Sequence, residues 1–205
     1  MSTQVDLGTV FKGSSSGKIV QAKGETVELK PDQVVIDIAY SGLCGSDLHF
    51  RKKGDMVLGH EGVGIISQVG KDVDFLKVGD RVGWGCNHNA CNYCKQCWNG
   101  VDTLCPHRAF YSMADPQFGS FGDRAVLSGY FVHKIPDDLP LKYAGPLQCG
   151  GATVYGAIVK AGVRPMERVG VLGLGGLGHL AVQYLNKMGC EVVVFSHSSS
   201  KKEQA

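Results

Sequence analysis

Short apolar runs separated by glycine-containing turns dominate the first two thirds of the 205-residue chain. From Val34 the run VVIDIAYS predicts a strand whose end leads to Cys44. The same kind of pattern predicts strands over Gly62–Val69 and Arg81–Trp84, and again within 124–135. A polar lead over 1–30, with a Gly/Ser cluster over 13–17, predicts two short strands joined by a turn. So many short strands predict a closed or nearly closed antiparallel barrel.

The pattern changes after Pro146. Residues 152–161 have a helical pattern that ends before Pro165, 169–172 form an apolar strand, and 176–188 predict a helix before a second strand at Glu191–Phe195. A strand, a helix and a strand in this order indicate the beginning of a βαβ unit. The sequence therefore predicts a mixed β and α/β protein, with a β-barrel domain over 1–152 and a partial dinucleotide-binding domain over 153–205.

Composition narrows the possible partners. The formal charge is +2 without a basic block, which argues against nucleic acid or an anionic membrane as the main partner. The start MSTQVDLGTVF has no signal-peptide pattern, and no run of 18 apolar residues occurs. We therefore expect a soluble cytoplasmic protein with no membrane association. The chain can bury one good core but is short for two domains, and its 29 glycines favour tight turns over long helices.

Chemistry-bearing side chains are concentrated in residues 44–61, which read CGSDLHFRKKGDMVLGHE. A thiol, a carboxylate and imidazoles this close together are costly to bury without a compensating partner, and a divalent metal compensates both thiolate and carboxylate. We interpret Cys44 and His60 as half of a zinc site.

A second cluster contains Cys91, Cys94, Cys97 and Cys105, with the spacing C-x2-C-x2-C-x7-C in a loop rich in Asn, Gly and Lys. Such a loop has little apolar surface, so a zinc ion held by four cysteines would fold it. An iron–sulfur cluster is the alternative, because C-x2-C-x2-C and a Pro after the last cysteine also occur in cluster motifs. Disulfide pairing would need an oxidising compartment. Cys86 and Cys190 match no ligand position, and His88 and His107 are predicted to be surface residues.

The third motif is G-x-G-x-x-G, formed by Gly173, Gly175 and Gly178 between an apolar strand and an apolar helix. This context is typical of a turn that binds a pyrophosphate at a helix N-terminus, here including Gly176 and Leu177. An acidic residue about 20 positions later would bind the 2′-hydroxyl of NAD. The sequence instead has the neutral to basic run SHSSSK from Ser196 to Lys201. This run favours NADP(H), and the alternative is a flexible Ser-rich turn.

In combination, CGSDLH, GHE, the four-cysteine lobe and the Gly-rich turn resemble the zinc-dependent medium-chain alcohol dehydrogenases. The resemblance is greatest to their NADP-using branch, which contains cinnamyl alcohol dehydrogenases and broad aldehyde reductases. It implies a GroES-like barrel followed by a Rossmann domain, two zinc ions per chain, one catalytic and one structural, and a primary alcohol or aldehyde as the substrate. We also expect the full-length protein to be a homodimer.

The resemblance also assigns roles to single residues. Cys149 would be the third ligand of the catalytic zinc beside Cys44 and His60, while Glu61 would tune the field or serve as an occasional ligand. Asp47 would orient His60, and the catalytic pair Ser46 and His49 would relay the alcohol proton to solvent.

For the cofactor, the resemblance places Thr153 against the nicotinamide, and Ser196, His197, Ser198 and Lys201 near the 2′-phosphate. The family's chains run well past Ala205, so we expect a truncated chain that binds zinc but reduces aldehydes poorly or not at all. Two alternatives remain: a non-catalytic zinc-binding remnant of the same family, and a zinc-free quinone reductase, which the zinc ligands disfavour.

Overall fold

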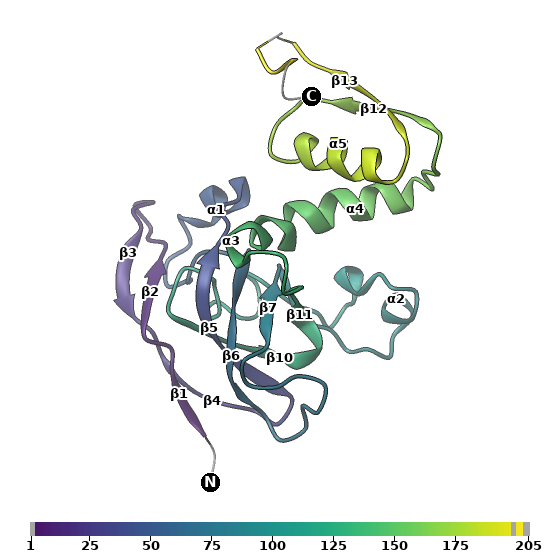
Figure 1. The fold of residues 1–205 in the computed structure, drawn as a ribbon. Coiled ribbons are helices and arrows are strands. Elements are labelled where there is room, and N and C mark those ends of the chain that lie inside the picture. Colours follow the sequence, from purple (N-terminus) through teal and green to yellow (C-terminus); the bar gives the residue numbers. More distant parts are fainter. Residues whose placement is uncertain (1–2, 198–199, 203–205) are drawn as a thin grey trace. The chain divides into compact units, whose positions relative to one another are not determined.

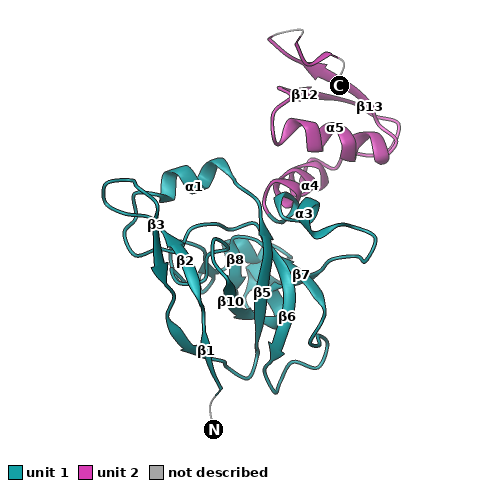
Figure 2. Cartoon of the chain, turned by 60° about the vertical axis from the view of Figure 1, so that its left-hand side comes forward, with its two compact units in different colours: residues 1–148 teal, residues 149–205 magenta. Residues whose placement is uncertain are grey.

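The computed structural model describes residues 3–197 and 200–202, and these form two compact units (Figure 2). Unit 1 comprises residues 1–148 and unit 2 residues 149–205. The division lies just before a helix that begins at Gly150. The boundary expected after residue 152 would have cut through the first turn of that helix.

Unit 1 is built mainly from short strands, with brief helical segments between them (Figure 1). Its strands are β1 (Gln4–Asp6), β2 (Thr9–Lys12), β3 (Val20–Lys23), β4 (Thr26–Glu28), β5 (Gln33–Ser41), β6 (Gly62–Val69), β7 (Arg81–Trp84), β8 (Asn87–Asn89), β9 (Ala109–Phe110), β10 (Arg124–Ser128) and β11 (His133–Lys134). Its helical segments are α1 (Gly45–Phe50), α2 (Lys95–Trp98), η1 (Asp102–Leu104), η2 (Gly129–Phe131), α3 (Leu141–Ala144) and η3 (Pro146–Gln148).

A five-stranded antiparallel sheet, in the order β10-β5-β6-β7-β11, forms the centre of unit 1. The ribbons β1-β4, β2-β3 and β8-β9 accompany it. The longest strand, β5, pairs with β10 on one side and β6 on the other, which explains why Val34, Val35 and Ile36 are all fully buried. Two register shifts interrupt the β5-β6 pairing, and the second lies near the end of β5 from which the chain continues to Cys44.

The predicted strands of the sheet are confirmed, and β6 and β7 have the predicted bounds. The N-terminal lead forms the expected pair β2 and β3, but also β1 and β4, which pair with each other. The continuous run expected over 124–135 is divided by η2, so that β10 and β11 lie at opposite edges of the sheet. The antiparallel β-fold of the domain is therefore confirmed, with more breaks than the pattern indicated.

The main core of unit 1 packs around the fully buried indole of Trp84. Gly62 lies directly against that ring, and a Cβ at this position would overlap the indole. Gly64 meets the Asp37 carbonyl in the same way. The close approach of β6 to its neighbours therefore depends on glycine.

We expect Gly62→Ala to lower the free energy of unfolding by about 1–3 kcal/mol, because overpacking must displace Trp84. Gly54→Ala is the matched control, since no atom lies within 4 Å of a Cβ built there. Urea denaturation of both variants measures the difference. Equal midpoints would contradict the assigned role of Gly62.

Unit 2 contains α4 (Gly150–Lys160), β12 (Arg168–Leu172), α5 (Gly178–Lys187) and β13 (Glu191–Phe195). β12 and β13 pair in parallel, with Val169 opposite Val192, and a small apolar cluster joins them to both helices. The predicted start of a Rossmann fold is confirmed. The helix α5 begins two positions later than predicted, because Gly175, Gly176 and Leu177 still belong to the turn that precedes it.

Within the described part of the chain, no helix is both long and apolar enough to cross a membrane.

Candidate metal centres

Cys44 lies at the start of α1, just after the central strand β5 has ended. It is the N-cap of α1, and its backbone N–H donates to Oδ2 of Asp47 at 3.0 Å. An acidic side chain in the first turn satisfies an otherwise unpaired amide and suits the helix dipole. The sequence CGSD therefore fixes the backbone of Cys44 through Asp47.

The second oxygen of Asp47 reaches His60. Oδ1 of Asp47 lies 2.9 Å from Nδ1 of His60, and both side chains are almost completely buried. Because a carboxylate can only accept a hydrogen bond, the proton of the neutral imidazole is on Nδ1 and the lone pair on Nε2. His60 is thereby held in the tautomer that binds a metal through Nε2.

Glu61 follows His60 and is also buried, with 4% of its surface exposed. Its side chain crosses directly over Gly42, where any Cβ would overlap the carboxylate. The Gly42 N–H donates to the Glu61 carbonyl at 2.9 Å, so the two segments are joined at this point. Only glycine at position 42 lets the carboxylate turn inward.

The position of Cys149 follows from the end of unit 1, to which it is directly bonded. There the side chain of Gln148 packs over Gly83 of β7, and its carbonyl packs over Gly85. The Gln148 side-chain amide also donates to the Ala144 carbonyl at 3.2 Å.

The ligand atoms of Cys44, His60, Glu61 and Cys149 lie within 4.8 Å of one another. The structure thus brings together the three residues predicted as ligands, and Glu61, predicted as an occasional ligand, lies in the same group. Two thiols and one imidazole are the donor set of a catalytic zinc site with an open fourth position, and alcohol dehydrogenase is a standard example of that set. The residues present therefore fit a zinc ion.

The predicted proton relay is less well defined. Ser46 is partly buried and His49 is exposed, three positions apart on α1. Within the described residues, no hydrogen bond joins them. Their roles remain predictions.

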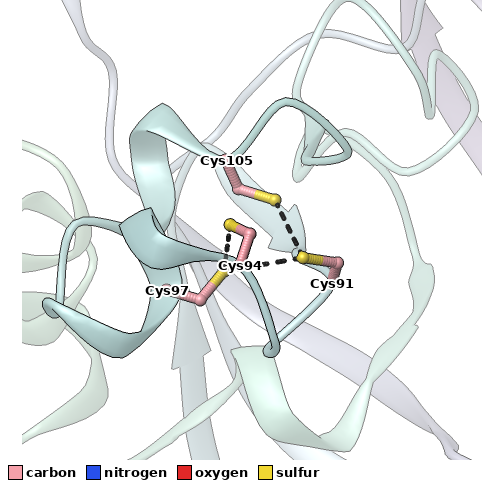
Figure 3. A group of neighbouring side chains, drawn as sticks. All are labelled: Cys91, Cys94, Cys97 and Cys105. Atoms are coloured by element: carbon pink, nitrogen blue, oxygen red, sulfur yellow. Dashed lines mark hydrogen bonds between the residues drawn. The ribbon is translucent and has the colours of Figure 1, made fainter.

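The four remaining predicted zinc ligands form a separate cluster in unit 1, where their sulfur atoms converge (Figure 3). The Sγ–Sγ distances are 3.5 Å between Cys91 and Cys105, 3.6 Å between Cys94 and Cys97, and 4.0 Å between Cys91 and Cys97. A tetrahedral zinc with Zn–S bonds of about 2.3 Å separates its sulfurs by about 3.8 Å. The spacing therefore fits a closed, four-thiolate zinc site.

Local structure explains this convergence. Cys94 is the N-cap of α2 and Cys97 lies within that helix, while Cys105 follows η1 and is fully buried. Burial and hydrogen bonds within the cluster raise the pKa of the Cys97 thiol to about 12. All eight cysteines lie within the described residues, and none of them forms a disulfide in place of the metal site.

His88 was predicted to be a surface residue, and this is wrong. It lies on β8 with only 2% of its surface exposed, and Nδ1 is 3.5 Å from Oδ2 of Asp115. The flanking residues Asn87 and Asn89 suggested a polar loop, but the pairing of β8 with β9 turns the middle residue inward. His107 is exposed, as predicted.

In unit 2 the Gly-rich turn has the form that its motif predicts. Gly173 has φ of +85°, a conformation that favours glycine. A Cβ on Gly178 would overlap the Gly173 carbonyl, whereas one on Gly175 or Gly176 would meet no atom within 4 Å. Gly173 and Gly178 are therefore required by the turn itself, and Gly175 and Gly176 leave open space beside it.

The other predicted cofactor residues belong to the same unit. Ser196 and His197 follow β13 and are exposed, and Lys201 folds back so that its Nζ donates to the Leu174 carbonyl at 2.8 Å. Thr153 is exposed on α4. Ser198 lies outside the described residues.

Comparison with known proteins supports this reading of the two units. The family model of the alcohol dehydrogenase GroES-like domain matches residues 30–137. A probable formaldehyde dehydrogenase, AdhA, of Bacillus subtilis (strain 168) is 40% identical over 203 residues, which is 93% of this chain and 58% of the relative. The chain thus spans little more than half the length of this curated relative.

Solved structures give the same result. A cinnamyl alcohol dehydrogenase of Sorghum bicolor matches with a TM-score of 0.86 and 32% identity, over 100% of this chain and 61% of that one. A cinnamyl alcohol dehydrogenase of Helicobacter pylori, complexed with NADP(H), matches with a TM-score of 0.83 and 33% identity, over 100% and 62%. With a GroES-like domain that matches the family model, two zinc-type donor clusters and the first strands of a Rossmann fold, this chain belongs to the zinc-type medium-chain alcohol dehydrogenase family.

Proposed function

We propose that the protein is a zinc-dependent alcohol dehydrogenase or aldehyde reductase that transfers a hydride between NADP(H) and a primary alcohol or aldehyde. The observation that supports this most strongly is the convergence of Cys44, His60 and Cys149, with Asp47 hydrogen-bonded behind His60. A zinc ion bound there would supply Lewis-acid polarisation of an alcohol or carbonyl oxygen. Two relatives that are 40% and 32% identical to this chain are named as dehydrogenases of formaldehyde and of cinnamyl alcohol.

In this proposal the chain's own residues have separate tasks. Two thiolates balance the charge of a divalent ion, so a neutral substrate is favoured at the remaining position. Asp47 holds the proton on Nδ1 of His60 and keeps Nε2 available. Ser46 would take the substrate proton and His49 would release it to solvent, in keeping with their partly buried and exposed positions.

We infer NADP(H) as the cofactor from the end of β13. In an NAD-binding fold an acidic side chain there accepts hydrogen bonds from the ribose 2′-hydroxyl. Here Ser196 and His197 occupy the end of the strand, and Lys201 lies against the Gly-rich turn. A neutral to basic surface suits a 2′-phosphate, and a relative has been solved with NADP(H).

Ser196→Asp is expected to weaken NADPH binding by roughly 10-fold or more, because one like-charge contact costs about 1.4 kcal/mol or more near a protein surface. NADH has no 2′-phosphate, so its affinity should fall less. Equilibrium dialysis of both cofactors against the parent chain and the variant measures the ratio. Equal affinity of the parent chain for NADPH and NADH would contradict the cofactor assignment.

A second candidate is a non-catalytic zinc-binding module, because both donor clusters could bind zinc without any turnover. Both candidates bind two zinc ions, so metal content alone does not separate them. The test is oxidation of NADPH by the zinc-loaded protein with a panel of aldehydes, with Cys149→Ser as the control. Turnover that is lost in the control supports the dehydrogenase, whereas zinc binding without NADPH binding or turnover supports the module.

A further inference from the structure

A cluster of four aromatic rings lies beside the His60 site, and Tyr111 is at its centre. Tyr111 follows β9, and its backbone N–H donates to the Cys86 carbonyl at 2.7 Å. Its side chain is completely buried and packs with Met56 and Leu58. All of these contacts lie within unit 1.

Three rings surround Tyr111 from three different segments. The ring centres of His60 and Tyr111 are 5.2 Å apart, and their planes are inclined by 34°. Phe50, the last residue of α1, meets Tyr111 edge-on at 5.4 Å, and His88 lies 6.2 Å away. These separations are within the range in which aromatic rings stabilise one another.

The hydrogen bond from His60 to Asp47 restrains only one edge of the imidazole. It fixes Nδ1, but the ring can still tilt about the line of that bond and move Nε2 away from the sulfur atoms. A fully buried ring packed beside the imidazole limits this freedom. Tyr111 is the ring in that position.

We propose that Tyr111 is a positioning residue that sets the plane of the His60 imidazole and thereby directs Nε2 at the donor group formed with Cys44 and Cys149. This inference rests on the proposed zinc site. The ring provides the effect rather than the hydroxyl, whose hydrogen bond to the Val57 carbonyl is long, at 3.4 Å. Burial raises the pKa of Tyr111, so the phenol stays neutral beside Asp47.

The test compares three variants of the 205-residue chain loaded with ¹¹³Cd. Tyr111→Leu removes the flat ring, Tyr111→Phe keeps it and loses only the hydroxyl, and Phe50→Leu removes a ring that contacts Tyr111. Cadmium bound by four sulfurs and cadmium bound by two sulfurs and a nitrogen give separate NMR signals. The four-cysteine site therefore serves as an internal reference for folding, and chelator competition gives the affinity of each site.

We expect Tyr111→Leu to weaken cadmium binding at the His60 site by roughly 10- to 100-fold, as for other groups that orient metal ligands, and to broaden its NMR signal. Tyr111→Phe should restore both the affinity and the signal, and Phe50→Leu should leave both close to those of the parent. Parent-like binding in Tyr111→Leu, or an equal loss in Phe50→Leu, would overturn the inference while the zinc site stands. If the parent chain itself bound no metal at His60, the proposed function would fail as well.

Discussion

Cys105→Ser is expected to weaken zinc binding at the four-cysteine site, so that a competing chelator which leaves the parent with two zinc ions leaves this variant with one. Zinc contributes about 10–16 kcal/mol in small zinc-folded domains, or about 3 kcal/mol for each of four thiolates. Loss of one thiolate therefore weakens binding by roughly 100-fold or more. Cys105 is fully buried against Cys91, at 3.5 Å, so no water-exposed group can replace it.

The loss of local structure in this variant should be confined to residues 91–105, the lobe that carries the four cysteines. Around α2 and η1 large apolar side chains are exposed, with Trp98 at 79% and Leu104 at 62%, so little burial holds this segment in place without the metal. Limited proteolysis should cut the variant within the lobe first. Cys190→Ser is the control, because this buried thiol lies in unit 2, where its Sγ donates to the Arg164 carbonyl at 3.4 Å and belongs to neither metal cluster. Parent-like zinc affinity at both sites of Cys105→Ser would contradict the assignment of this cluster as a metal site.

His60→Ala is expected to empty the other site and to leave the four-cysteine site loaded. The substitution removes the only nitrogen ligand and leaves the buried carboxylate of Asp47 without its partner, so we also expect a loss of about 2–4 kcal/mol in unfolding free energy. Metal analysis should find one zinc per chain, and chelator titration should find a single class of site, which Cys105→Ser weakens further.

Asp47→Asn should have a smaller effect on the same site than His60→Ala. The amide has a single acceptor oxygen for two donors, the Cys44 N–H and the His60 Nδ1–H. Zinc affinity at the His60 site should fall by roughly 10- to 100-fold, less than for loss of the ligand itself. Full zinc content in His60→Ala, with the fold intact by circular dichroism, would mean that His60 is not a ligand.

Much of the fold could be predicted from sequence because its strands carry their signal locally. β6 and β7 alternate or run apolar over their whole length, and their predicted bounds were confirmed. The four short strands of the N-terminal lead were harder to see, since β1 and β4 have three residues each and are mostly exposed. The start of α5 was placed too early because glycines and leucine fit both a turn and a helix, and only the close contact between Gly178 and Gly173 separates them.

Residue type and sequence spacing were enough to predict most members of the two metal centres. The four cysteines are near in sequence, and Cys44 and His60 belong to one motif. The inward turn of Glu61 could not be predicted, because it depends on the absence of a side chain at Gly42, which lies on another segment. His88 and Tyr111 could not be placed beside the site from sequence, because the pairing of β8 with β9 brings their segments together.

X-ray absorption at the zinc edge of the Cys105→Ser variant, after a chelator has removed zinc from the weakened four-cysteine site, tests the central claim most directly, because only the site of Cys44, His60 and Cys149 should then hold zinc. We predict one zinc per chain with about two sulfur neighbours at about 2.3 Å and nitrogen or oxygen neighbours at about 2.0–2.1 Å. A zinc surrounded only by nitrogen and oxygen, or no retained zinc at all, would contradict the account.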